Sequence, residues 1–99
     1  GRGSPLRLLS HLTALDLNAN HIGPAGATEL FGALGRGSPL RILDLDLNHI
    51  GQDGLIRLAE ALPVELRTLR LRGNWIGDWA AGYLAESLSQ CPSLHTLDL

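Results

Sequence analysis

The chain of 99 residues contains no lysine and no methionine, and it has only one cysteine and four aromatic residues. With the single Cys91 it can form neither an internal disulfide framework nor a thiolate zinc cluster, which favours a reducing, cytoplasmic compartment. Because methionine is absent, we expect the sequence to be a piece of a longer protein. No apolar run approaches the roughly 18 residues of a membrane span. The formal net charge of -2 disfavours binding to nucleic acid or to a membrane surface.

Leucine supplies most of the apolar content, with 23 residues, and it recurs at a fixed period. LTALDLNANHIG begins at Leu12, LRILDLDLNHIG at Leu40, LRTLRLRGNWIG at Leu66, and a shorter LHTLDL at Leu94. These starts lie 28, 26 and 28 residues apart. A repeat of this length predicts a stack of similar structural units.

Each unit contains two spacings of apolar residues. Leu43 and Leu45 alternate with polar residues, as in a short strand, whereas Leu58 and Leu62 have the spacing of one helix face. A strand that returns through a helix in the same phase lies parallel to its predecessor. Since strands pack about 4.8 Å apart and helices about 10 Å apart, the stack should bend toward its strands. The sequence therefore predicts an α/β curved solenoid, with parallel strands on the concave side and helices on the convex side.

The pattern L-x-x-L-x-L-x-x-N-x-I-G-x-x-G-x-x-x-L-x-x-x-L resembles the leucine-rich repeat of the ribonuclease-inhibitor type. That repeat also occurs in NOD-like receptors and in the activator of the nuclear-transport GTPase. On this resemblance the repeats span 12–39, 40–65 and 66–93, with a truncated copy at 94–99. Residues 1–11 are interpreted as the remnant of a preceding repeat or an irregular N-terminal segment.

The resemblance implies a non-catalytic protein–protein interaction module that binds a protein partner through the concave strand face and its rim. One alternative is part of a regulatory domain that activates a small GTPase, and another is a purely structural repeat segment. A further expectation is end-to-end self-association through uncapped repeats, because the last strand has no following repeat to cover it.

Polar residues between the core leucines predict columns of side chains across the concave face. Asp44 and Asp46 would lie about 6.6 Å apart, a spacing that could suggest paired catalytic carboxylates. Arginines at the same phases of the next strand instead favour cross-strand ion pairing. An acidic patch would then grade into a basic strip, which also includes Arg67, and would orient a charged partner. The predicted contact residues on this face are Asp16, Asp44, Asp46, Arg70 and Arg72.

Two further columns follow the strands. His21, His49 and Trp75 would lie at the rim, where they either contact a partner or merely cover the adjacent loops. Two imidazoles without a third ligand make a poor metal site. The recurring amides are predicted to be structural, bonding the backbone of neighbouring turns. They are Asn20, Asn48 and Asn74.

The sequence contains no phosphate-binding loop, zinc-ligand spacing or nucleophile elbow. We therefore expect no catalytic residue, cofactor or metal. Phe31, Trp79 and Tyr83 fall on the predicted helices and are expected to pack on the convex side. Cys91 is interpreted as a small apolar filler.

Overall fold

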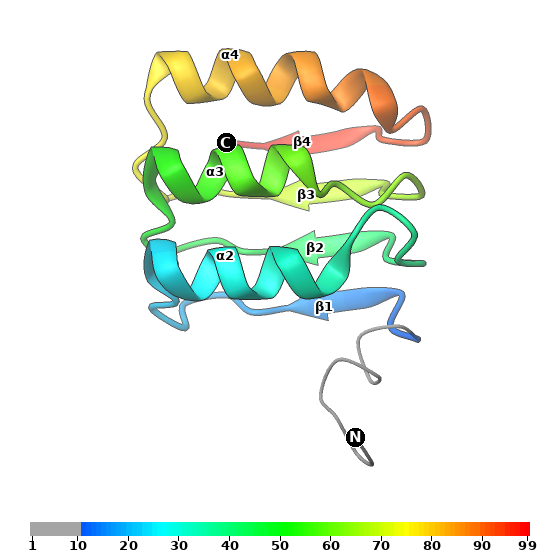
Figure 1. The fold of residues 1–99 in the computed structure, drawn as a ribbon, viewed down its shortest axis with the longest axis horizontal. Helices are drawn as coiled ribbons and strands as arrows, with labels where there is room; N and C mark the ends of the chain where they lie inside the picture. The colour runs from blue at the N-terminus through cyan, green and yellow to red at the C-terminus, as the bar shows by residue number, and fades with distance from the viewer. Residues whose placement is uncertain (1–10) are drawn as a thin grey trace.

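The computed structural model describes residues 11–99 and shows strands and helices alternating along the chain (Figure 1). The interpretation of residues 1–11 lies outside this range except at His11. The elements are β1 (Ala14–Asp16), α2 (Gly23–Leu34), β2 (Ile42–Asp44), α3 (Gly51–Glu60), β3 (Thr68–Arg70), α4 (Asp78–Ser87), a 3-10 turn η1 (Leu88–Gln90) and β4 (Thr96–Asp98).

The four strands form one parallel sheet in the order β1-β2-β3-β4. Their register places Leu15 opposite Leu43, Leu43 opposite Leu69, and Leu69 opposite Leu97. This register confirms that the repeats are in phase when counted from Leu12. Figure 1 shows the three helices in a separate layer beside the sheet. The α/β repeat solenoid is thus confirmed, while its bend toward the strands stays a prediction. We call the side of the sheet away from the helices the strand face.

The hydrophobic core fills the space between the two layers. Leu43 and Leu69 in the middle strands, and Leu45 and Leu71 directly after them, are completely buried, because each has a neighbouring repeat on both sides. On the edge strand β4, in contrast, Leu97 is 40% exposed. The predicted packing role of one helical aromatic is also confirmed, since the Phe31 side chain is buried in this core.

Helices α2 and α3 begin directly after the Asn-x-Ile motif, and α4 begins one residue later, at Asp78. Gly23 and Gly51 have a φ of +72°, a conformation that favours glycine, and they open α2 and α3. Pro24 lies in the first turn of α2, where its missing N–H leaves no helical hydrogen bond unmade. The helices α2 and α3 contain 12 and 10 residues, so the shorter second repeat loses its two residues at the end of the helix. None of the helices in residues 11–99 is long and apolar enough to cross a membrane.

Candidate functional site

The strand face presents two columns of side chains in register. One consists of Ala14, Ile42, Thr68 and Thr96, and the other of Asp16, Asp44, Arg70 and Asp98. Ile42 is 46% exposed at the centre of the first column. The sheet therefore brings the predicted charged residues onto one surface, with an exposed aliphatic side chain among them.

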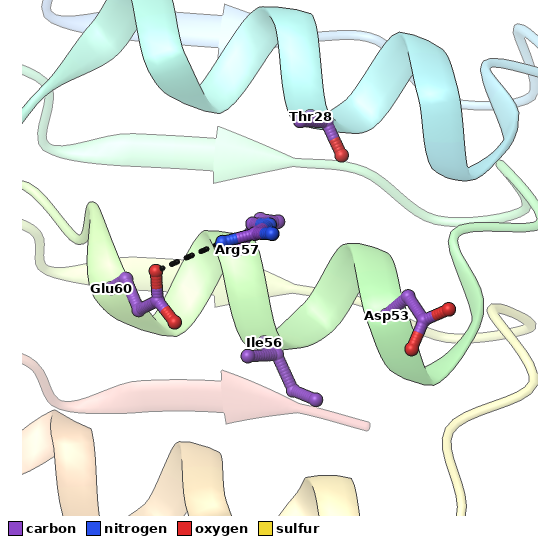
Figure 2. A pocket seen from close by; sticks show the side chains of 5 residues that line it. All are labelled: Thr28, Asp53, Ile56, Arg57 and Glu60. Carbon is purple, nitrogen blue, oxygen red and sulfur yellow. Dashed lines mark hydrogen bonds and ion pairs between the residues drawn. The ribbon is translucent and has the colours of Figure 1, made fainter.

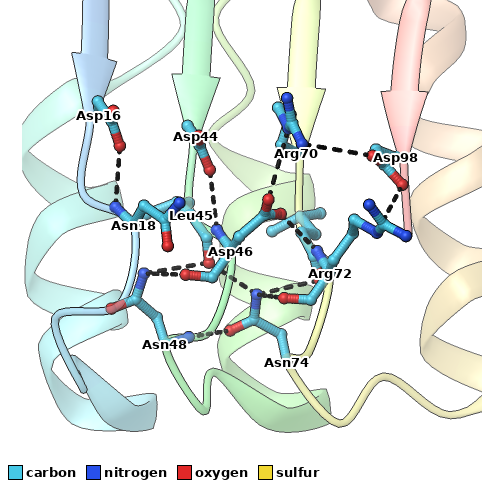
Figure 3. A network of polar contacts seen from close by, with 11 residues as sticks. Asp16, Asn18, Asp44, Leu45, Asp46, Asn48, Arg70, Arg72, Asn74 and Asp98 are labelled. Atoms are coloured by element: carbon cyan, nitrogen blue, oxygen red, sulfur yellow. Dashed lines mark hydrogen bonds and ion pairs between the residues drawn. The ribbon is translucent and has the colours of Figure 1, made fainter.

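Asp46 is the centre of a charged network that spans three repeats (Figure 3). Its Oδ1 accepts a hydrogen bond of 2.7 Å from the backbone N–H of Arg72, and its Oδ2 lies 3.4 Å from Arg70 Nε. The Arg70 Nε–H is not aligned for a hydrogen bond, so this contact is an ion pair. Asp98 lies 3.7 Å from Arg70 Nη2 and 3.4 Å from Arg72 Nε. Both arginines therefore face a carboxylate.

The structure corrects the predicted charge pattern in two respects. Asp46, expected to be an exposed contact residue, is only 6% exposed, because its carboxylate packs against the third repeat and accepts the backbone N–H of Arg72. Asp44 is in register with Arg70 but forms no ion pair with it; its Oδ1 accepts the backbone N–H of Asp46 at 3.1 Å. Asp16 Oδ1 likewise accepts a hydrogen bond from the backbone N–H of Asn18, at 3.0 Å. These two carboxylates close turns at the strand ends, as short acidic side chains commonly do.

Two of the recurring asparagines are buried and connect neighbouring repeats. Asn48 Nδ2 donates to the carbonyl oxygen of Leu17 at 2.8 Å, and Asn74 Nδ2 donates to that of Leu45 at 2.7 Å. Asn74 Oδ1 also accepts the backbone N–H of Asn48 at 3.1 Å. Asn20 differs, because it is exposed and, within the described residues, its side-chain amide donates to the carbonyl oxygen of Asn18 in its own turn at 3.2 Å. The amides thereby satisfy backbone groups that the tight turns leave unpaired.

His21, His49 and Trp75, which we call the aromatic rim, lie side by side along the edge of the strand face. All three have positive φ values, between 52° and 59°, so their side chains leave equivalent turns in the same direction. The ring centroids of His21 and His49 are 5.2 Å apart, and those of His49 and Trp75 are 4.3 Å apart. His49 Nε2 lies 3.2 Å from His21 Nδ1. The outermost ring, Trp75, is 71% exposed.

Leu47, adjacent to this rim, was not among the predicted contact residues. It is 52% exposed and has a φ of +59°, which is unusual for a leucine. Ala19 and Gly73 occupy the same position in the other repeats. A leucine at a position otherwise held by alanine and glycine was the signal in the sequence that could have indicated it.

Two surface hollows in the described part of the chain lie in the helix layer. The larger, of about 470 Å³, lies beside α3 and is lined by Thr28, Asp53, Ile56, Arg57 and Glu60. In it, Arg57 Nη1 lies 3.5 Å from Glu60 Oε2 (Figure 2). The smaller hollow, of about 290 Å³, is formed by α4. Among residues 11–99 no three His, Cys, Asp or Glu side chains are placed to hold a metal ion.

Cys91 lies at the end of the third repeat and is 3% exposed. Its Sγ–H donates to the carbonyl oxygen of Pro63 at 3.4 Å. Burial raises the pKa of the thiol, and nearby Arg36 opposes this effect more weakly. A protonated, buried thiol is a poor nucleophile.

Comparison with protein families gives the same architecture. The family model described as leucine rich repeat matches residues 9–31, 38–59 and 66–85. The chain belongs to the leucine-rich repeat family. Leucine-rich repeats generally mediate protein–protein interaction and are typically not catalytic. A search of curated proteins finds no match.

Proposed function

We propose that this leucine-rich repeat chain is an interaction module of the ribonuclease-inhibitor type, which binds a protein partner through the strand face and the aromatic rim. The observation that carries the proposal is the exposure of large side chains along one surface. Ile42, Leu47 and Trp75 are 46%, 52% and 71% exposed. Apolar side chains gathered on one surface are typical of a protein-binding site. Repeats of 26 to 28 residues with true α-helices support the assignment to this type.

The residues of the site divide into contact residues and positioning residues. Trp75 and Arg72, of types enriched at the centres of interfaces, are the strongest contact candidates, and the Arg72 side chain is 64% exposed. Exposed Asp16 and half-buried Asp44 would orient a partner by charge. Asp46 and Arg70 hold the turn after β2 against the third and fourth strands.

A matched pair of double variants tests the proposal. Arg72→Ala/Trp75→Ala removes one exposed arginine and one exposed tryptophan from the site. Ile56→Ala/Arg57→Ala removes a partly exposed apolar side chain and an exposed arginine from helix α3, where the Arg57 side chain is 60% exposed. The partner is identified by photo-crosslinking from position 42 of the immobilised chain, and its recovery with each variant is quantified.

We expect Arg72→Ala/Trp75→Ala to lower recovery of the crosslinked partner by about tenfold or more, because truncating interface anchors commonly has this effect. The helix-layer variant should retain recovery. Unchanged recovery with the strand-face variant, or equal loss with both, would contradict the proposal.

The other expectations from the family resemblance have separate tests. Activation of a small GTPase would appear as faster GTP turnover with the parent protein. End-to-end self-association would appear in sedimentation of the isolated chain, and a stable monomer would contradict it. The cytoplasmic assignment is supported by the single cysteine, which is buried and carries a free thiol.

A further inference from the structure

The outer face of α4 carries an aromatic pair. Trp79 is 65% exposed, so the expectation that it packs against the convex side is wrong. Tyr83 does pack against the core and is half-buried. The two rings stack with centroids 6.0 Å apart and planes inclined by 28°. Tyr83 thereby supports the Trp79 ring while leaving much of the indole open to solvent.

A hollow accompanies this pair because α4 has a glycine in its middle turn. A Cβ placed on Gly82 would meet no atom within 4 Å. The hollow of about 290 Å³ is lined by Asp78, Trp79, Gly82, Tyr83 and Glu86. Its wall is therefore aromatic on one side, and it has room for a side chain that α4 itself does not supply.

The hollow is also acidic. Asp78 and Glu86 both line it, and neither forms an ion pair with any residue in the described part of the chain. The segment 78–90 contains no arginine, lysine or histidine. Two carboxylates beside an exposed indole would attract a cation rather than an anion or a neutral group.

On helix α3 of the second repeat, an arginine of the chain itself occupies the surface that corresponds to the hollow on α4. Trp79, Gly82, Tyr83 and Glu86 of α4 correspond in the repeat to Asp53, Ile56, Arg57 and Glu60 of α3. In α3 the Arg57 guanidinium lies beside Glu60, within the chain itself (Figure 2). In α4 the glutamate is kept, the arginine is replaced by tyrosine, and the isoleucine is replaced by glycine. Glu86 thus corresponds to Glu60 of the Arg57–Glu60 ion pair, but α4 has no arginine at the position of Arg57.

We propose that the hollow on α4 binds an arginine side chain presented by a basic segment of a protein partner. The guanidinium would stack on the Trp79 ring and pair with the carboxylates of Glu86 and Asp78. Arginine suits both contacts, because its plane stacks on aromatic rings and its fork matches a carboxylate. This surface lies in the helix layer and does not depend on the function proposed for the strand face.

The indole N–H signals of Trp75 and Trp79 in an NMR titration test the proposal directly. The probe is Nα-acetyl-arginine amide, and the matched neutral probe is Nα-acetyl-citrulline amide. We expect arginine to shift the Trp79 signal in low salt and citrulline to leave it unchanged. Trp75 serves as the internal control, since it is an exposed tryptophan on the other layer. The response should weaken in high salt, as for surface charges.

Three variants establish which groups form the site. Gly82→Ile restores the branched side chain that α3 has at this position and should fill the hollow. Glu86→Gln removes the retained carboxylate, and Trp79→Ala removes the ring. Because Trp79→Ala also removes the reporter signal, binding to this variant is followed by the backbone N–H signal of Gly82. Each should weaken arginine binding by about fivefold or more. Glu60→Gln, the matched change on α3, should leave it intact.

The proposal would be overturned if Trp75 and Trp79 shift equally, if citrulline matches arginine, or if Gly82→Ile leaves binding unchanged. Stronger binding of trimethyllysine amide than of arginine would also overturn the assignment to a guanidinium. Because the readout is a small-molecule titration, failure here would leave the partner recovery that tests the strand face unaffected, and the reverse also holds.

Discussion

Asp46 is the residue whose carboxylate joins the turn after β2 to the third repeat on the strand face. It accepts the Arg72 backbone N–H at 2.7 Å and faces Arg70 while 6% exposed. We expect Asp46→Ala to lower the free energy of unfolding by about 2 kcal/mol, because hydrogen bonds to charged acceptors contribute about that much and Arg70 would lose a partner. Urea denaturation measures the loss.

Two further variants separate the hydrogen bond from the charge. Asp46→Asn keeps an oxygen for the Arg72 N–H and should recover part of the loss. Asp44→Ala removes a hydrogen bond of 3.1 Å at a more exposed site and should cost less than Asp46→Ala. Equal effects of Asp44→Ala and Asp46→Ala would show that the buried network contributes no special stability.

At this scale the sequence predicts positions better than roles. The alternation of leucines correctly placed Asp16, Asp44 and Asp46 on the strand face, but nothing in the sequence distinguishes the buried carboxylate from the other two. The difference arises from the neighbouring repeat, because of these three carboxylates Asp46 is the one within hydrogen-bond distance of the Arg72 backbone N–H. Non-local contacts of this kind are set by the three-dimensional packing of repeats.

At the scale of the helices, two glycines offer a direct test of packing against propensity. A Cβ on Gly32 in α2 would meet nothing within 4 Å, whereas a Cβ on Gly54 in α3 would overlap with Ile50 Cγ2. We expect Gly32→Ala to stabilise the protein by about 0.5 to 1 kcal/mol, because alanine is the better helix former. Gly54→Ala should destabilise it by about 1 kcal/mol or more, since overpacking in a filled core outweighs that gain.

Thermal unfolding of the two variants measures both effects. A stabilised Gly54→Ala variant would mean that the buried Ile50 side chain moves aside without cost. Gly26→Ala supplies a second comparison, because its Cβ would lie 2.7 Å from Ile22 Cγ2, and Ile22 is less buried than Ile50. Its destabilisation should therefore be smaller than that of Gly54→Ala.

The leucine spacing predicted each strand and helix, but it did not predict that the backbone enters α4 differently from α2 and α3. The third repeat has alanine, Ala80, where the first two have glycine, and this alanine is buried. Its helix also starts differently: Gly77 has a φ of -85°, whereas Gly23 and Gly51 have +72°. The altered entry into α4 is consistent with the added methyl group, and a single sequence gives no signal for such a change in backbone path.

At the scale of the whole molecule, each repeat is joined to the next by the sheet, the buried amides and the core. Asn48 and Asn74 bond the backbone of the preceding repeat. The Cys91 thiol likewise donates a hydrogen bond to the carbonyl oxygen of Pro63, 28 residues earlier in the chain. Because every repeat completes the burial of its neighbour, we expect the described repeats to unfold together rather than one at a time.

Cys91 gives a pH-dependent measure of this unfolding. Burial raises the pKa of its thiol above the ordinary value of 9.0, so the folded protein holds the proton to higher pH than the unfolded chain does. The stability contributed by Cys91 is therefore fully present below about pH 9 and is lost as the pH rises toward the folded-state pKa. We expect the free energy of unfolding from urea titrations to fall more steeply above that pH in the native chain than in Cys91→Ala. All other groups are the same in both proteins and cancel in the comparison, so identical slopes would show that the thiol ionises equally in the folded and unfolded states.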